Sequence, residues 1–371
     1  MRILRLCAVI LSAGLLVGCA PRGDIVMMPE GGKAVATRDI FVGTTRLGTP
    51  SEDPKSERGR SEVLRFLRYD VSIPPDRIAG EIPISLPNHK PDPSKDFLTT
   101  SIESYDTPAA FRSDLGKALR AHGGEAVIFV HGYNTTFAEG LYRMAQLGDD
   151  LALPGVLVHY SWPSMGQPLG YAYDRDSALF ARDGLRELME EMTRAGAKKI
   201  VLFGHSMGAQ LVMESLRDLS RNDPAHVRNR ISGVALMAPD IDVSLFHSQA
   251  RDIGKLPQPF LIFTSPRDPI LRLSARISGE ADRLGLIDAP ERLSDLKVTL
   301  VDVSAFAGSD PHFIVGTSPT LMAILRKATQ ANTALASGQQ GRTGLLPGVV
   351  LTVQNATSIV MTPISDQPLR R

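Results

Sequence analysis

The stretch that decides the fold is IVLFGHSMG at residues 200–208, where a short apolar run meets a Gly-x-Ser-x-Gly motif. Apolar residues then recur on one helical face, so the stretch predicts a buried strand, a tight turn and an immediate helix. Ser206 lies at the turn, and Gly204 and Gly208 leave room for the strained backbone that such a turn imposes. The first N–H of the helix, that of Met207, is placed to stabilise negative charge beside the serine. The alternative is a glycine-rich turn with a capping serine.

The same alternation continues on both sides of this unit. Short apolar runs predict strands buried on both faces at 126–130, 156–160, 200–203, 234–237, 260–263 and 298–303. Amphipathic stretches predict helices at 111–121, 174–195, 207–221 and 319–330. We therefore expect an α/β fold, with a mostly parallel, doubly wound sheet and flanking helices.

The two ends of the chain have a different composition. Residues 20–60 are polar and rich in Gly, Pro, Ser and Arg, which predicts a tether with room for one short strand at 40–42. Prolines and short alternating patches predict short edge strands and loops over 63–105. The Gly-, Gln- and Thr-rich residues after about 336 predict a loosely attached tail with at most one hairpin, from the runs 349–353 and 359–361.

A second motif, VIFVHGYN at 127–134, ends another predicted strand upstream of the serine. Its place fits a loop whose backbone N–H, near Tyr133, joins that of Met207 in an oxyanion hole, the pair of donors that stabilises the negative oxygen in acyl transfer. His131 precedes the serine in the chain, so we predict that it orders this loop and is not the catalytic base. For His205, inside the turn, we expect the backbone to matter more than the ring.

Two further motifs supply the remaining groups of a serine-based catalytic site. Asp268 and His312 follow the last two predicted strands, so both lie where the carboxyl ends of parallel strands meet. The order Ser, Asp, His predicts that His312 is the base for Ser206 and that Asp268 orients it. Asp240 and Asp242, one strand earlier, are the alternative acids. Asp310 is too close to His312 in the chain and is predicted to serve as a turn or cap.

Residues 162–175 follow a strand end and contain glycines, prolines and tyrosines. They form either part of a small lid over the pocket or a surface loop packed by its own aromatic side chains. The eight histidines are scattered without HExxH or paired spacing, so we predict neither a metal nor any other cofactor.

The N-terminus, MRILRLCAVILSAGLLVGCA, has the layout of a secretory signal: two arginines, then an apolar run over 6–17 that is too short to span a bilayer comfortably. The run ends in LVGC, which resembles the bacterial lipobox, in which the signal is cut before the cysteine and the thiol is lipidated. The resemblance implies a multiply acylated anchor on Cys19, and Ala20 implies the outer membrane, facing the periplasm. The alternative is an ordinary signal with a chance cysteine. We thus predict a signal peptide at 1–18, a tether at 19–60, a folded domain at 61–335 and a flexible tail at 336–371.

Composition limits the remaining classes of function. The 371 residues include 41 Lys and Arg, 40 Asp and Glu, and two cysteines. A formal charge of +1 provides no sequence-wide electrostatic footprint for nucleic acid, so membrane attachment is expected from lipid alone. Cys7 leaves with the predicted signal and Cys19 carries the lipid, so the mature domain has no thiol for a disulfide, a zinc site or a nucleophile.

With these motifs the chain resembles the α/β-hydrolases. More narrowly, it is similar to a bacterial family of uncharacterised α/β-hydrolase-like proteins of the DUF900 type, often predicted to be membrane-associated. The resemblance covers roughly residues 40–330 and implies the α/β-hydrolase fold and the triad Ser206, Asp268 and His312, but no substrate. The matching stretches are FVGTTR (41–46), YDVSIPPDR (69–77), VIFVHGYN (127–134), HYSWPS (159–164), FGHSMG (203–208), APDID (238–242), SPRDPIL (265–271) and DPHF (310–313).

The complete set of residues predicts a serine hydrolase of the cell envelope, an esterase- or lipase-like enzyme that cleaves carboxylic esters through an acyl-enzyme. An acyltransferase or peptidase on the same triad, or a non-catalytic envelope scaffold with a hydrolase fold, are the alternatives. The expected substrate is a small-molecule or lipid ester. The sequence indicates neither its acyl and alcohol groups nor the oligomeric state.

Overall fold

A computed structural model describes residues 22–29, 36–48, 58–86, 89–279, 282–336, 348–353 and 356–361. The predicted signal peptide and Cys19 lie outside the described residues. Within them, an 11-stranded sheet runs in the order β10-β11-β9-β8-β7-β6-β4-β5-β1-β2-β3. Its strands are β1 Ala36–Arg46, β2 Arg60–Ile73, β3 Leu98–Tyr105, β4 Glu125–Val130, β5 Val156–Ser161, β6 Lys199–His205, β7 Ile231–Met237, β8 Phe260–Thr264, β9 Thr299–Asp302, β10 Gly348–Val353 and β11 Ala356–Met361.

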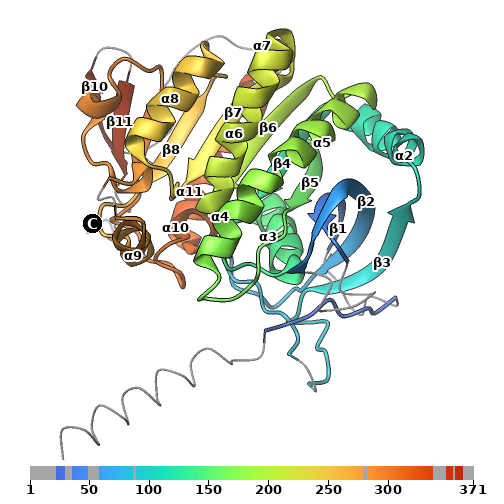
Figure 1. Cartoon of the computed structure of the whole chain (residues 1–371). Helices are drawn as coiled ribbons and strands as arrows, with labels where there is room; N and C mark the ends of the chain where they lie inside the picture. The colour runs from blue at the N-terminus through green and yellow to red at the C-terminus, as the bar shows by residue number, and fades with distance from the viewer. Residues whose placement is uncertain are drawn as a thin grey trace, which may run out of the picture.

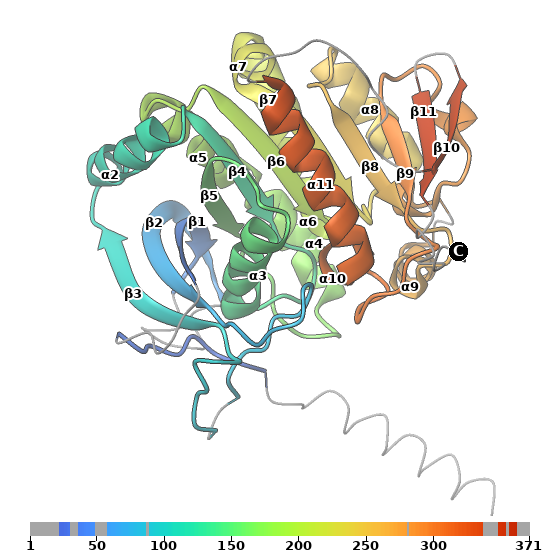
Figure 2. The same cartoon turned by 180° about the vertical axis from the view of Figure 1, so that it is seen from behind.

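The sheet is parallel from β11 to β1 and antiparallel at its two ends, where β10 pairs with β11, and β2 pairs with β1 and β3. Helices cover both faces, as Figures 1 and 2 show from opposite sides. This is the mostly parallel, doubly wound α/β fold that the sequence predicts. The helices are α2 Pro108–Ala121, α3 Phe137–Asp150, α4 Tyr171–Phe180, α5 Arg182–Arg194, α6 Met207–Asn222, α7 Pro224–Arg230, α8 Val243–Ile253, α9 Pro269–Ser278, α10 Ile314–Thr317 and α11 Pro319–Ala336, with short 3₁₀ turns at Leu284–Leu286 and Pro290–Leu293.

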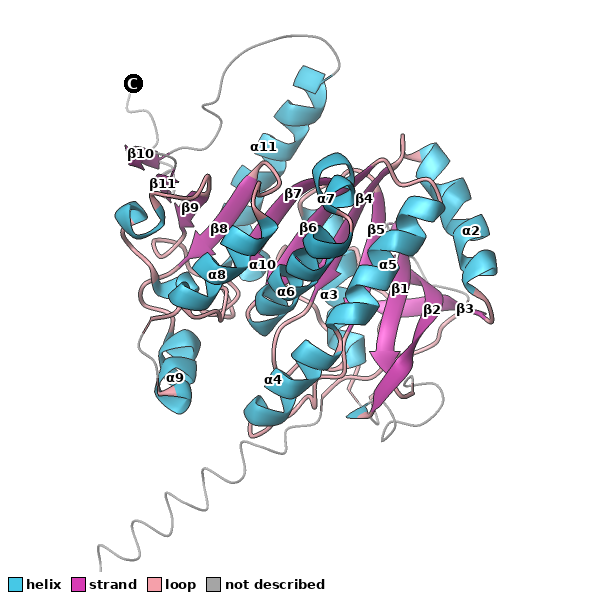
Figure 3. Ribbon diagram, turned by 45° about the horizontal axis from the view of Figure 1, so that its top comes forward, coloured by secondary structure: helices cyan, strands magenta, loops and turns pink. Residues whose placement is uncertain are grey.

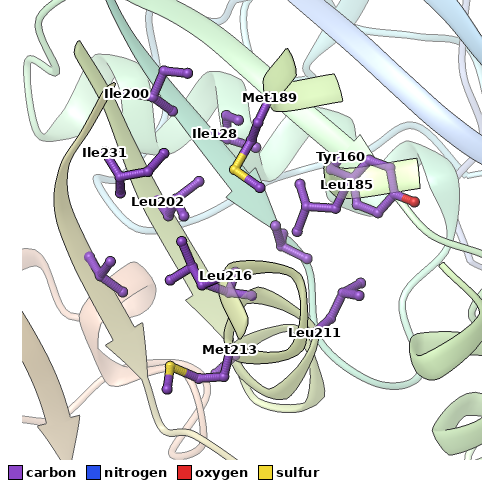
Figure 4. Close-up of a cluster of buried hydrophobic side chains, with 14 of the residues drawn as sticks. Ile128, Tyr160, Leu185, Met189, Ile200, Leu202, Leu211, Met213, Leu216 and Ile231 are labelled. Atoms are coloured by element: carbon purple, nitrogen blue, oxygen red, sulfur yellow. The ribbon is translucent and has the colours of Figure 1, made fainter. Parts of the chain in front are cut away.

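Two hydrophobic cores form, one on each face of the sheet. Alternate residues of β4 point to opposite faces, so Ile128 packs with α5 and α6 while Phe129 packs with α3. Figure 4 shows the first core, in which Leu185, Met189 and Leu216 of the two helices meet the strands. Because both faces are covered, the central strands are apolar throughout, which is why they were recognisable as continuous runs.

The crevice of the fold follows from the strand order. The chain leaves β4 through α3 to one neighbour, β5, and later leaves β6 through α6 to the other side. Helices α3 and α6 contribute to opposite cores (Figure 3), so the loops after β4 and β6 diverge and open a crevice between them. In such sheets this switch point, at the carboxyl ends of the strands, is where ligands bind.

Several elements differ from the sequence-based expectation. The short strand expected at 40–42 is the 11-residue β1, which lies between β5 and β2 in the sheet interior. The expected helix at 174–195 is two helices, α4 and α5, which meet at Ala181, where the Tyr160 hydroxyl donates to the Ala181 carbonyl at 2.6 Å. The strand β2 is 14 residues long, although short edge strands were predicted.

Other elements were not predicted at all. Helix α3 is buried on nearly every side, and α7, α8 and α9 are short. At the other end of the chain, the expected hairpin forms as β10 and β11, and β11 extends the main sheet by pairing with β9. No helix of the described part is both long and apolar enough to traverse a bilayer.

Candidate functional site

Ser206 lies at the turn between β6 and α6, in a conformation that side chains rarely adopt. Its φ is 53° and its ψ is −121°. The backbone around it keeps the residue there: its N–H donates to the Met237 carbonyl at 3.0 Å, and its carbonyl accepts from Ala209 N at 3.0 Å and Asp240 N at 3.2 Å. The serine is almost fully buried. Backbone strain of this kind gathers at functional sites, where the surrounding structure maintains it.

The glycines on either side of Ser206 permit close backbone contacts. A Cβ atom on Gly204 would lie 2.8 Å from Ala209 Cα, across the turn. A Cβ atom on Gly208 would lie 2.2 Å from the His131 carbonyl oxygen and 2.5 Å from that of Val130. The first turn of α6 therefore packs directly on the end of β4, as a nucleophile elbow requires.

We expect Gly208→Ala to destabilise the fold by about 3 kcal/mol, because its clash is with backbone and cannot be relieved by a rotamer change. Urea unfolding would measure the loss. Gly233→Ala in β7 is the matched control, since its Cβ would meet nothing closer than Pro259 Cδ at 3.5 Å. Equal stability of the two variants would contradict the close contact.

His312 and Asp268 are in direct contact, although 44 residues separate them. The Nδ1–H of His312 donates to Asp268 Oδ2 at 2.7 Å, and both side chains are buried. The other oxygen, Oδ1, accepts from Ile270 N at 2.8 Å and Leu271 N at 3.1 Å, so Asp268 is also the N-cap of α9. With its proton on Nδ1, His312 presents the lone pair of Nε2, which is buried without a hydrogen-bond partner among the described residues.

Ser206 and His312 are connected in space through Gly132 and the His205 ring. A Cβ atom on Gly132 would lie 3.0 Å from Ser206 Cβ and 2.7 Å from Nδ1 of His205. The His205 ring in turn lies 4.9 Å from the His312 ring, centre to centre. No hydrogen bond joins Ser206 to His312 in the described structure, and such bonds often tighten only when substrate binds. The His205 ring thus packs against His312 and Phe313, although its backbone was expected to matter more than its ring.

Of the two alternative acids, Asp242 caps the start of α8, and Asp240 is engaged elsewhere. Its carboxylate accepts from Tyr171 Oη at 2.9 Å and Ser274 Oγ at 2.7 Å, and forms an ion pair with Arg283 at 3.2 Å. These partners hold Asp240 beside α9 and away from the His312 imidazole, which pairs with Asp268 instead. Asp310 accepts from the backbone N–H of His312 at 2.8 Å, which confirms its predicted role in the turn.

The loop after β4 lies against the serine. His131 orders it as predicted: its carbonyl accepts from Trp162 Nε1 at 2.7 Å, its ring stacks on the indole with centroids 4.9 Å apart, and Nδ1 contacts the Gly132 carbonyl at 2.9 Å. The Tyr133 hydroxyl donates to the Pro168 carbonyl. The Met207 N–H belongs to the first turn of α6, where N–H groups have no partner within the helix.

Two buried charged residues that were not predicted as site residues, Arg46 and Asp174, support this loop. Arg46, at the end of β1, donates to Ser161 Oγ at 2.8 Å, to the Ser164 carbonyl at 3.0 Å and to the Thr135 carbonyl at 3.0 Å. Asp174 accepts from Ser164 Oγ at 2.6 Å and from Asn134 N at 3.1 Å. The sequence feature that pointed to Arg46 was its position at the end of FVGTTR, one of the stretches that match the family.

These contacts also place residues 162–175, the predicted lid or surface loop. The segment is tied to the loop after β4 through Asp174 and Tyr133, and to Asp240 through Tyr171. Its aromatic side chains therefore pack on other elements: Trp162 on His131, Tyr171 on Tyr133, and Tyr173 under the guanidinium of Arg60. Its role as a lid stays a prediction.

A cleft of about 600 Å³ opens beside His312, His205 and Gly132. Residues 22–23 and 82–86, predicted as tether and loops, line one side of it. Arg143 lies in the cleft wall, where it donates to the Gly80 carbonyl at 3.0 Å and the Gly316 carbonyl at 2.9 Å, and burial lowers its pKa to about 10. In the described part of the chain, no three His, Cys, Asp or Glu side chains cluster in a way that could hold a metal ion.

Three buried histidines are expected to make the stability of the fold depend on pH. Burial lowers the pKa of His159 to about 3 and holds the pKa values of His131 and His205 well below 6.5. The folded chain therefore keeps them neutral, while the unfolded chain binds protons below about pH 6.5. We expect the free energy of unfolding to fall between pH 6.5 and pH 5, by up to about 1.4 kcal/mol per pH unit for each histidine. Urea titrations of the natural chain and of His159→Gln at both pH values would test this, because an unchanged slope in the variant contradicts it.

Comparison with known proteins assigns the chain to a family. Residues 107–326 match the model of the family described as "Alpha/beta hydrolase of unknown function (DUF900)". No curated protein matches the chain significantly. Among solved structures, the chain is similar to a putative hydrolase from Agrobacterium vitis (15% identity, TM-score 0.35, covering 74% of this chain and 95% of that one). It is also similar to a dienelactone hydrolase from Anabaena variabilis (12% identity, TM-score 0.37, covering 74% of this chain and 93% of that one). A third similar structure is esterase B from Lactobacillus rhamnosis (11% identity, TM-score 0.37, covering 91% of this chain and 96% of that one).

Proposed function

This chain belongs to the DUF900 family of α/β-hydrolases, and from that premise we propose that it is a serine hydrolase of carboxylic esters at the cell envelope. One observation carries the proposal: His312 Nδ1 contacts Asp268 Oδ2 at 2.7 Å, beside a serine with a strained backbone at a strand-to-helix turn. Hydrolases need these parts together, because a serine hydroxyl is a weak nucleophile until an oriented base takes its proton.

In the proposed mechanism, the lone pair of His312 Nε2 takes the proton of Ser206 Oγ as that oxygen attacks the ester carbonyl. Asp268 keeps the imidazole in the required tautomer and stabilises its positive charge. The negative oxygen of the tetrahedral intermediate accepts hydrogen bonds from the backbone N–H groups of Met207 and Tyr133.

The intermediate then collapses and the C–O bond to the alcohol breaks. His312 returns its proton to the leaving alkoxide, which departs as the alcohol and leaves an acyl group on Ser206. Water attacks the acyl carbon and gives a proton to Nε2. Collapse of the second intermediate releases the carboxylic acid and restores the Ser206 hydroxyl.

A fluorophosphonate probe tests this proposal without a guess about the substrate, because it reacts with any activated serine. We expect labelling of the natural chain at Ser206 and none in Ser206→Ala. A folded natural chain that stays unlabelled would favour the non-catalytic scaffold. Protein that the probe labels can then be given esters, peptides, or esters together with an acyl acceptor. The substrate that it turns over separates an esterase from a peptidase or an acyltransferase.

We also propose that the chain is an outer-membrane lipoprotein anchored through Cys19. The support is the lipobox-like LVGC at the end of the apolar N-terminal run. Cells fed labelled palmitate should incorporate it into the natural chain, and Cys19→Ala should abolish the incorporation. Persistent labelling of the variant would refute the anchor at this residue.

A further inference from the structure

Helix α9 exposes an apolar face that none of the described elements covers. Ile270, Leu273 and Ile277 are spaced three and four residues apart, so they lie on one side of the helix. Their side chains are 40%, 52% and 60% exposed. In Figure 1, α9 projects from the edge of the molecule outside the helical layers that cover the sheet. An exposed aliphatic row of this kind marks an interaction surface.

The charges on α9 favour one kind of partner. Arg272 and Arg276 alternate with the exposed aliphatic side chains and are themselves exposed. The helix Pro269–Ser278 contains no acidic residue. A short helix with aliphatic side chains and arginines, and with no carboxylates, fits the boundary between the headgroups and acyl chains of anionic lipids.

The apolar row continues around the mouth of the candidate site. Ile270 and Leu86, both exposed, line the cleft beside His312. Leu169 is 99% exposed and follows Pro168, whose carbonyl accepts the Tyr133 hydroxyl. These side chains form what we call the apolar rim: Leu86, Leu169, Ile270, Leu273 and Ile277.

The chain leaves the cleft mouth close to the predicted anchor. Arg22 lines the cleft and is bound firmly there: its guanidinium donates to the Asn134 carbonyl, to Asn134 Oδ1 and to the Gly166 carbonyl, each at 2.7 Å, and pairs with Glu139. Cys19 precedes Arg22 by three residues. Because a fully extended chain spans at most about 3.6 Å per residue, their Cα atoms are at most about 11 Å apart.

We propose that the apolar rim rests in the lipid surface to which Cys19 is anchored, so that the cleft receives its substrate directly from the bilayer. The substrate class is then an acyl ester of a membrane lipid. The inference rests on the proposed function and on the lipid anchor. The contacts of Arg22 limit the distance between the cleft and the membrane, and contact of α9 with lipid sets the orientation of the cleft relative to the membrane.

The orientation can be measured on the full-length acylated protein in vesicles of phosphatidylethanolamine and phosphatidylglycerol. The natural mature chain has no cysteine besides Cys19, so Ile277→Cys accepts one polarity-sensitive dye. We expect blue-shifted emission that brominated acyl chains quench. The matched control is Val63→Cys, which is also exposed. Val63 lies in β2, six strands from β8, the strand that precedes α9, so the two strands are roughly 29 Å apart. Equal quenching at both positions would overturn the proposal.

The substrate class needs a second measurement. The double variant Leu273→Asp, Ile277→Asp should hydrolyse a diacylglycerol in the same vesicles at least tenfold more slowly, because two aliphatic contacts with lipid are lost. Hydrolysis of soluble p-nitrophenyl butyrate should stay unchanged, and Val63→Asp should change neither rate. An undiminished rate on the vesicle ester would contradict the proposal. If the natural chain hydrolyses neither ester, the proposed function fails, while dye quenching still decides the orientation.

Discussion

Ser206→Ala is expected to lower the turnover of a short p-nitrophenyl ester by a factor on the order of 10⁶. The reason is chemical: the variant cannot form the acyl-enzyme, so only the oxyanion donors and substrate binding remain to accelerate the reaction. The measurement is the steady-state kcat of the purified full chain beside the variant. Unchanged turnover would remove Ser206 from the mechanism.

Ser206→Gly is the matched variant that separates chemistry from folding. It also lacks the hydroxyl, but glycine adopts a φ of 53° without strain. We therefore expect it to be as inactive as Ser206→Ala and more stable than that variant, by about 1 kcal/mol in the free energy of unfolding. Equal stability would show that the turn is not strained.

Asp268→Asn is expected to lower kcat by roughly 10⁴, the second largest effect. An amide at this position lacks the negative charge that stabilises His312 when it takes the proton, and its NH₂ group favours the wrong tautomer of the ring. Asparagine is also a good N-cap, so α9 should keep its start and the fold its stability. The expected loss is therefore in turnover and not in folding.

Asp240→Asn is the control for this prediction. Its carboxylate pairs with buried Arg283 and accepts from Tyr171 and Ser274, so its loss should destabilise the fold by roughly 3 kcal/mol. We expect its kcat to stay within about tenfold of the natural chain. If Asp240→Asn loses more kcat than Asp268→Asn, then Asp240 is the acid that orients the base.

The parts that sequence reasoning predicted share a physical property: they are local. The turn at Ser206 needs a glycine two residues away on each side, and the strand, the serine and both glycines lie within nine consecutive residues. The central strands are apolar runs because both of their faces are covered. The turn role of Asp310 depends on backbone N–H groups two and three residues away.

The parts that it missed depend on contacts between distant residues. Arg46 reaches Thr135 across 89 residues, so its burial depends on a segment that is far away in the chain. Helix α3 carries Glu139 and Arg143 on one side, and these polar residues find partners far away in the chain: Arg22 pairs with Glu139, and Arg143 donates to the Gly316 carbonyl. Residues 22–29 fall in the stretch predicted as a tether, yet Arg22 binds the loop beside the serine.

By itself the sequence determined the fold class, the position of Ser206 at a strand-to-helix turn, and the placement of Asp268 and His312 after late strands. It left three carboxylates as candidate partners for His312, namely Asp268, Asp240 and Asp242, because each follows the end of a parallel strand. The folded structure selects Asp268: His312 Nδ1 meets Asp268 Oδ2 at 2.7 Å, while Arg283 pairs with Asp240 and Asp242 caps α8. The physical reason is that a strand order specifies which loops meet, whereas the direction of each side chain depends on partners that fold in from elsewhere in the chain.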